Sequence, residues 1–310
     1  MNVLCLDHVC HRQTGSFDFF VGILRSAGMN VDVFYYDRHY CVKPSREKVD
    51  WADMIVYLEF LPSRFRLLFP GKRIVYLPMY DNEWGSKWQW RRIAWSGMGV
   101  VSFSKQVSAH ARKLNVRNIL EVQYFLDPSR FPQERGETKR VFLWERGDID
   151  RHAAEILFPP SDGYVFDIKY RNEFLDRDAY LNRIAKCEIM VAPRRKEGIG
   201  MVFLEAMAMG KCVAAHDDAT MNEYIKDGET GILFCAEHPK PVSYAAVSSV
   251  QGNICKCASG LWASWQGDIP RIVAFVSGQQ PCHPTIWGRL RMLLAFPLFV
   301  VEGFCQRFIN

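Results

Sequence analysis

The sequence lacks the features of a membrane-spanning or exported chain. No stretch reaches the roughly 18 consecutive apolar residues of a transmembrane helix, and the nearest candidate, residues 292–301, contains Pro297. The N-terminus, MNVLCLDHVCHRQTG, has no basic region followed by an apolar core of signal-peptide length. The ten cysteines are scattered through apolar runs such as NVLCL and are not spaced like a disulfide framework. We therefore expect a cytoplasmic protein in a reducing compartment.

The usual cofactor and metal motifs are also missing. No G-x-G-x-x-G follows the first apolar run, where the chain has DHVCHRQTG, and this weighs against a dinucleotide-dependent oxidoreductase. Asp217-Asp218 is too short to count as an Asp-x-Asp metal motif. Cys255-x-Cys257 lacks the typical spacing of two to four residues between zinc ligands. The sequence thus predicts no metal site and no bound cofactor.

What the sequence does contain is an alternation of short apolar runs with amphipathic stretches. In the first part of the chain a helical pattern lies near 17–27, and apolar runs lie at 2–6, 30–36, 54–58, 73–77 and 100–104. Nearly continuous apolar runs separated by helical patterns are typical of a parallel sheet covered on both faces. A polar, proline-bearing stretch at 127–140 then interrupts the pattern and is interpreted as a linker.

The alternation restarts after this stretch. Further apolar runs lie at 141–144, 164–168, 188–192 and 213–215, with helical patterns near 150–157, 178–185 and 200–209. The predicted fold is therefore α/β, with two Rossmann-like domains facing a cleft. The predicted domains are 1–130 and 131–260, followed by a C-terminal helical segment at 261–310.

The most informative segment runs from Arg194 to Phe234. After a buried strand, Glu197-Gly198-Ile199-Gly200 forms a tight turn, and the helix formers MVFLEAMAM follow it. A glycine loop that opens a helix at the carboxyl end of a parallel strand presents free backbone N–H groups to a phosphate or sugar oxygen. Glu205 lies about one turn inside this helix, where a carboxylate is rarely buried without partners, so ribose hydroxyls are suitable partners for it.

Glu197, seven residues and Glu205 resemble the E-x7-E signature of glycosyltransferase family 4. The resemblance continues to a D-G-x-x-G turn at 227–231 and, more weakly, covers residues 1–235. It implies a GT-B fold and a retaining transfer of a hexose-like sugar from a nucleoside diphosphate-sugar to a glycan or lipid-linked acceptor. It also implies catalysis without a divalent metal, and a place in bacterial surface polysaccharide biosynthesis.

The same resemblance assigns roles to the donor-side residues. It implies that Glu205 holds the ribose, that Glu197 contacts the donor sugar hydroxyls, and that the amides of Gly198–Met201 line the sugar and phosphate site. Arg146 is the first candidate for the diphosphate cation because a guanidinium matches a diphosphate well. Arg151 is a second candidate and stands where the family has lysine.

The first domain departs from the family pattern. The stretch HRQTGSFDFF at 11–20 resembles the loop after the first strand, with only Gly15 left of the usual paired glycines. In LPMYDNEW, where the family often has histidine, Asp81 is a candidate catalytic residue beside Glu197 and Arg146. Asp81, His11 and His110 can each also be interpreted as ordinary polar groups. These departures keep open an alternative function, a catalytically degenerate nucleotide-sugar-binding protein.

The positive charge is concentrated in one part of the chain. Residues 61–117 contain eleven Lys or Arg and two acids, a net +9, although the whole chain has a net charge of +5. This stretch can be a solvated face, a nucleic-acid patch or a surface for anionic lipid, and we favour the lipid surface and predict no nucleic-acid partner. The apolar C-terminal run, which carries Arg289, Arg291 and Arg307, is either an anchor on the inner face of the plasma membrane or a helix packed on the first domain.

Overall fold

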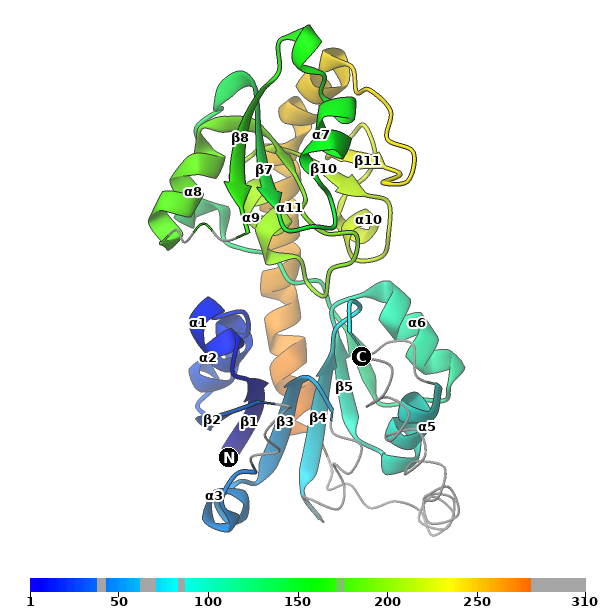
Figure 1. The fold of residues 1–310 in the computed structure, drawn as a ribbon. Helices are drawn as coiled ribbons and strands as arrows, with labels where there is room; N and C mark the ends of the chain where they lie inside the picture. Colours follow the sequence, from blue (N-terminus) through cyan, green and yellow to red (C-terminus); the bar gives the residue numbers. More distant parts are fainter. Residues whose placement is uncertain (38–42, 62–70, 83–86, 172, 174–175, 280–310) are drawn as a thin grey trace. The chain divides into compact units, whose positions relative to one another are not determined.

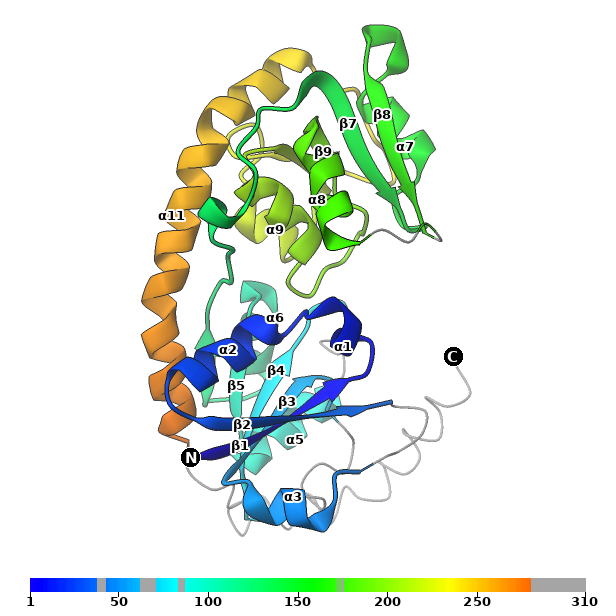
Figure 2. The same ribbon diagram turned by 90° about the vertical axis from the view of Figure 1, so that its left-hand side faces the viewer.

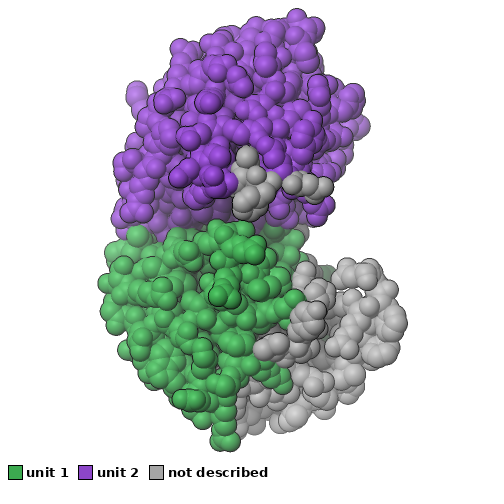
Figure 3. Space-filling view, turned by 60° about the vertical axis from the view of Figure 1, so that its left-hand side comes forward, with its two compact units in different colours: residues 1–122, 268–310 green, residues 123–267 purple. Residues whose placement is uncertain are grey.

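The computed structural model describes residues 1–37, 43–61, 71–82, 87–171, 173 and 176–279. The chain divides into two compact units, residues 1–122 with 268–310 and residues 123–267 (Figure 3). Each unit is built on its own parallel sheet with helices on both faces (Figures 1 and 2).

The sheet of unit 1 has the order β2-β1-β3-β4-β5-β6, and all of its strand pairs are parallel. Its strands are β1 (Asn2–His8), β2 (Asn30–Tyr36), β3 (Met54–Glu59), β4 (Arg73–Pro78), β5 (Gly99–Ser102) and β6 (Ile119–Glu121). All six residues of β3 are buried, as expected of a central strand covered by helices on both sides.

The helices of unit 1 are α1 (His11–Thr14), α2 (Asp18–Ser26), α3 (Arg46–Trp51), α5 (Lys87–Ser96) and α6 (Lys105–Lys113). Figure 1 shows α2 on one face of the sheet and α5 and α6 on the other. The side chains of Ser45 and Ser104 accept backbone N–H bonds and cap the first turns of α3 and α6. The end of the described chain belongs to this unit, since Gln279 accepts a hydrogen bond from Asn118 at 2.6 Å.

Unit 2 has the sheet order β11-β10-β9-β7-β8, again with parallel pairs. Its strands are β7 (Glu137–Glu145), β8 (Val165–Tyr170), β9 (Cys187–Val191), β10 (Cys212–His216) and β11 (Ile232–Phe234). The α-helices are α7 (Arg151–Leu157), α8 (Arg177–Ala185), α9 (Met201–Ala208), α10 (Met221–Tyr224) and α11 (Tyr244–Ser277), and short 3-10 turns are η1 (Pro128–Arg130) and η2 (Pro160–Asp162). The last ten residues of α11 belong to unit 1.

Side chains of β7 alternate between the two faces of this sheet. Val141 and Leu143 enter a core that includes residues of α7 and the start of α11. Phe142 and Trp144 contact Tyr180 of α8, with ring centroids 6.0 and 5.7 Å away. The alternation follows from the period of two along a strand, and it places Trp144 on the α8 side of the carboxyl end of β7.

The predicted α/β architecture with two parallel sheets is confirmed, while the domain boundaries differ from the predicted ones. The division lies at 122/123 instead of 130/131, because the polar stretch is tied to unit 2: Gln133 donates to the Ala208 carbonyl and Lys211 to the Glu134 carbonyl. The boundary predicted at 260/261 falls inside α11. The predicted membrane anchor at the C-terminus lies outside the described residues.

Candidate functional site

The carboxyl ends of β7 and β9 form the point in unit 2 where the strand order reverses. From β7 the chain proceeds to β8 on one side and later returns to β9 on the other. In open α/β sheets, ligands bind outside the carboxyl ends of the strands at such a switch point. Arg146 follows β7 here, and the loop from Arg194 to Gly200 follows β9.

This loop is the predicted glycine loop, and its geometry requires glycine at the start of α9. Gly200 has φ +81°, and a Cβ placed on it would lie 1.9 Å from Cε1 of Phe203. Within the described chain, the backbone amides of residues 198–201 donate no hydrogen bond to another backbone or side-chain group. The loop therefore offers a run of amides to a ligand oxygen, next to the positive end of α9.

Glu205 is buried in α9, with 3% of its surface exposed. Arg177 of α8 lies 2.8 Å from its Oε1, and the buried hydroxyl of Tyr180 lies next to the carboxylate without meeting hydrogen-bond geometry. Burial raises the pKa of Glu205, and the Arg177 guanidinium opposes that rise. A carboxylate held this way inside the fold has acceptor capacity left for hydroxyl groups.

Glu197 is also buried, in the middle of the glycine loop and directly before Gly198. Arg194 lies on the same turn, with its Nη1 3.5 Å from Oε2 of Glu197. The structure thus brings together, at one edge of unit 2, the donor-side residues that the sequence indicated on β9 and α9.

The two arginines proposed for the diphosphate behave differently. Arg146 is exposed, its guanidinium lies 4.7 Å from the centre of the Trp144 ring, and it forms no ion pair in the described chain. Arg151 lies in the first turn of α7 and donates to Glu155 of the same helix at 2.6 Å. Arg146 is therefore available to an anion, whereas Arg151 already has a carboxylate partner.

Unit 1 has its own switch point, between β1 and β3, and a charged cluster occupies it. His11 lies between two carboxylates, with Nδ1 2.6 Å from Asp7 and Nε2 2.9 Å from Glu59. Both acids raise the pKa of His11 against the effect of burial, to about 9, and burial raises the pKa of Asp7. Glu59 has φ +68°, which is uncommon for a residue other than glycine and often marks functional positions.

Asp81 and Gly15 lie in the same unit. Asp81 precedes Asn82, whose side chain donates to Glu59 of this cluster. Gly15 ends α1 with φ +61° and donates its N–H to the His11 carbonyl at 2.8 Å. The sequence singled out Asp81 and Gly15 but not the Asp7–His11–Glu59 cluster, because only the pairing of β1 with β3 brings those acids together.

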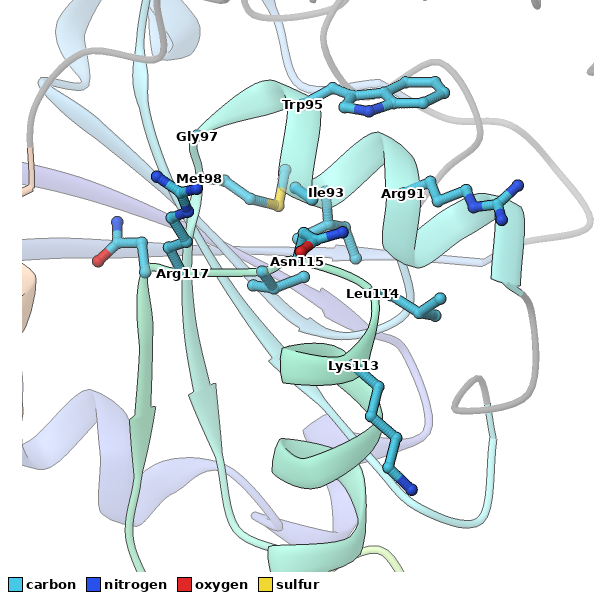
Figure 4. Close-up of a pocket in the computed structure, with 12 residues that line it drawn as sticks. Arg91, Ile93, Trp95, Gly97, Met98, Lys113, Leu114, Asn115 and Arg117 are labelled. Atoms are coloured by element: carbon cyan, nitrogen blue, oxygen red, sulfur yellow. The ribbon is translucent and has the colours of Figure 1, made fainter.

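The basic stretch contributes to a concavity of about 690 Å³ on unit 1, at the amino ends of β5 and β6 (Figure 4). Arg91, Lys113 and Arg117 line it together with Trp95, and no carboxylate of the described residues pairs with any of the three cations. In Figure 4 the charged ends of Arg91, Lys113 and Arg117 lie at separate places around the concavity. The charges are thus distributed over a surface and do not converge on one small ion.

The described residues contain neither a metal-binding cluster nor a membrane-spanning helix. No group of three or more His, Cys, Asp or Glu side chains there is placed to hold a metal ion. No helix in that part of the chain has both the length and the apolar character needed to cross a membrane.

Comparison with known proteins relates both the fold and part of the sequence to glycosyltransferases. Residues 169–250, which include the glycine loop and Glu205, match the family model of glycosyl transferases group 1. A 60-residue stretch is 38% identical to alpha-D-kanosaminyltransferase of Streptomyces kanamyceticus, covering 19% of this chain and 16% of that protein. The chain therefore spans only a small part of the length of this relative.

Solved structures of glycosyltransferases resemble most or all of the chain. HepE of Anabaena, in complex with UDP and glucose, is 13% identical, with a TM-score of 0.57 over 88% of this chain and 100% of that chain. Sucrose-phosphate synthase of Thermosynechococcus elongatus is 13% identical, with a TM-score of 0.54 over 100% and 99% of the two chains. At this identity the likeness shows the fold, which is the GT-B fold of two Rossmann-like domains.

Proposed function

We propose that the protein is a retaining glycosyltransferase that moves a hexose-like sugar from a nucleoside diphosphate-sugar to a glycan or lipid-linked acceptor. The observation that carries the proposal is the buried carboxylate of Glu205 beside a glycine loop whose amides have no other partner in the described chain. The group 1 match of residues 169–250 and the UDP named with HepE support a nucleotide-sugar donor. The retaining outcome and a role in bacterial surface polysaccharide biosynthesis rest on the resemblance to family 4.

The donor contacts follow from the chemistry of each group. Glu205 accepts hydrogen bonds from the ribose hydroxyls, and Glu197 accepts them from the sugar. The amides of residues 198–201 and the guanidinium of Arg146 bind the diphosphate and stabilise the charge that develops on it as the sugar leaves. Amide dipoles and arginine supply this positive charge without a divalent metal, so we propose a metal-independent enzyme.

The acceptor is assigned to unit 1 in this proposal. Asp81 and the Asp7–His11–Glu59 cluster lie at the carboxyl ends of β1, β3 and β4, where an α/β sheet binds ligands. Carboxylate oxygens accept hydrogen bonds from acceptor hydroxyls and so orient the attacking group.

The test of the donor site is a thermal-shift panel of UDP-, GDP-, ADP- and CMP-sugars, because a ligand that binds only the native state raises its stability. Wild type should respond selectively to one nucleotide, and Glu205→Gln should lose that response. A wild type that responds to none of the four would contradict the proposal. A selective response without sugar transfer to any acceptor would instead favour the degenerate binding protein.

We further propose that the concavity of unit 1 binds the anionic inner face of the plasma membrane. Arg91, Lys113 and Arg117 have no carboxylate partner there, and an interfacial position suits the indole of Trp95. A distributed set of cations fits a charged surface, at about 1 kcal/mol per basic residue. Replacing the three with glutamine should therefore weaken binding to phosphatidylglycerol vesicles about 100-fold at low salt.

A charge-matched control separates this surface from net charge alone. Lys43, Arg46 and Lys240 are exposed cations that do not line the concavity, and their triple glutamine variant should bind the vesicles nearly as well as wild type. Equal losses in the two triple variants, or no wild-type binding at low salt, would exclude the concavity as the lipid surface.

A further inference from the structure

Two cations share one aromatic ring at the carboxyl ends of β7 and β8. Trp144 of β7 is in register with Lys169 of β8. The Lys169 Nζ lies 4.2 Å from the centre of the Trp144 ring, and the Arg146 guanidinium carbon lies 4.7 Å from the same centre. The two positive charges are therefore within about 9 Å of each other, a distance at which like charges in a protein repel.

Neither cation is neutralised by an acid in the described chain. Lys169 is only 6% exposed, yet it has no ion pair and no hydrogen bond among the described residues. The nearby carboxylates of Asp167 and Glu173 are both bound by Arg183. Burial lowers the pKa of Lys169, and the charges of Arg183 and Arg146 act in the same direction against Glu173.

Two neighbouring cations without an anion to neutralise them lower the stability of the fold. Buried charges in proteins are normally paired, and an unpaired one lowers the stability of the fold. A cation–π contact with Trp144 compensates one cation in part, by roughly 1–2 kcal/mol. It gives no reason for the same ring to contact a second cation while Glu173, the acid whose charge acts on Lys169, is ion-paired with Arg183.

The pair is connected to the candidate donor site through direct contacts. Trp144 packs on Tyr180, with ring centroids 5.7 Å apart, and the Tyr180 hydroxyl lies next to the carboxylate of Glu205. Arg146 itself follows β7 at the switch point of unit 2. Contacts through Trp144 and Tyr180 thus connect both cations to Glu205 within unit 2.

We propose that Lys169 binds the diphosphate of the donor together with Arg146, and so supplies the second cation that the sequence had assigned to Arg151. The inference rests on the proposed function, since it requires a nucleoside diphosphate donor. Arg151 is bound by Glu155 on its own helix, whereas Lys169 comes from the neighbouring strand and has no acid partner in the described chain.

The test compares three ligands, UDP, UMP and uridine, by titration calorimetry on wild type and Lys169→Gln, with GDP and ADP as further arms. Loss of a charged contact of about 1.5–3 kcal/mol corresponds to a drop of about 10- to 100-fold in affinity for the diphosphate. Affinity for uridine should stay within about twofold, a difference of less than 0.5 kcal/mol. Lys169→Arg should retain most of the diphosphate affinity, because the charge is kept.

Two controls separate this role from a structural one. Arg151→Gln removes a cation of the same unit and should leave UDP affinity within about twofold. Lys169→Gln should melt at the same or a higher temperature than wild type, because it removes an unpaired buried charge; a purely structural cation–π role predicts a lower melting temperature.

The outcomes are distinct from those of the donor proposal. If wild type binds a nucleoside diphosphate, Glu205→Gln weakens it and Lys169→Gln does not, then the assignment of Lys169 is wrong and the donor site stands. If wild type binds none of UDP, GDP and ADP, both the donor site and the role of Lys169 are refuted.

Discussion

Replacing Glu205 with glutamine should weaken donor binding without destabilising the fold. Glu205 is 3% exposed, and burial raises the pKa of its carboxyl above the ordinary value of 4.5. A raised pKa means that the folded state binds this proton more tightly than the unfolded state, so stability is lost as the pH rises through the folded pKa. At neutral pH the ionised carboxylate therefore lowers the free energy of unfolding.

Glutamine removes this cost while keeping the size of the side chain and an oxygen for Arg177. Arg177 is 59% exposed, so its charge stays solvated when the carboxylate is lost. The free energy of unfolding should be unchanged or rise by about 0.5–2 kcal/mol, as for other substitutions that remove a functional cost. The loss of charged hydrogen bonds to ribose should cost about 1.5–3 kcal/mol of binding, or about 10- to 100-fold in affinity.

Scanning calorimetry at several pH values and titration with the nucleotide selected by the panel measure the two effects. The gap in stability between wild type and Glu205→Gln should narrow as the pH falls, because the wild-type carboxyl then becomes protonated in the fold. Glu229→Gln, an exposed acid of the same unit, is the control and should change neither quantity. A variant that melts lower and binds nucleotide like wild type would show that Glu205 is structural.

Two further predictions concern the Asp7–His11–Glu59 cluster of unit 1 and the glycine loop of unit 2. His11→Gln should lower the free energy of unfolding by up to about 3 kcal/mol at pH 6, measured by urea titration. The loss should disappear as the pH rises through about 9, because a histidine with a raised pKa stabilises the fold fully below pH 6.5 and no longer does so above its folded pKa. A loss of stability that is constant with pH would contradict this prediction. Gly200→Ala should lower the free energy of unfolding by at least about 2 kcal/mol and abolish the thermal shift with nucleotide, because the added Cβ would meet Phe203. Gly228 has φ +70° and open space around it, so Gly228→Ala should lower the free energy of unfolding by only about 1 kcal/mol. Equal losses at the two glycines would mean that backbone strain alone, and not the packing of the loop, sets the effect.

The sequence predicted those parts of the molecule that local patterns determine. The strands were visible as apolar runs because parallel strands are buried on both faces, and β2 was predicted with its observed bounds, 30–36. The glycine loop was visible because Gly200 marks a turn directly before strong helix formers. The burial of Glu205 also followed from its place inside an apolar helix.

The rest depends on contacts between segments distant in the sequence. Arg177 meets Glu205 because α8 packs beside α9, and Lys169 meets Trp144 because of the register of β7 with β8. Neither pairing has a sequence motif. By contrast, the engagement of Arg151 with Glu155 could have been found, since the two are spaced i, i+4 on a predicted helix.

The most direct test of the central claim is a transfer assay with the nucleotide-sugar that the panel selects, with p-nitrophenyl glycosides as acceptors. The proposed function predicts that, in the presence of EDTA, nucleoside diphosphate is released together with a new glycoside whose retained anomeric configuration is read by NMR. It also predicts a loss of turnover in Glu197→Gln and Glu205→Gln. Tight donor binding with no release of nucleoside diphosphate, with or without acceptor, would contradict it and identify a nucleotide-sugar-binding protein instead.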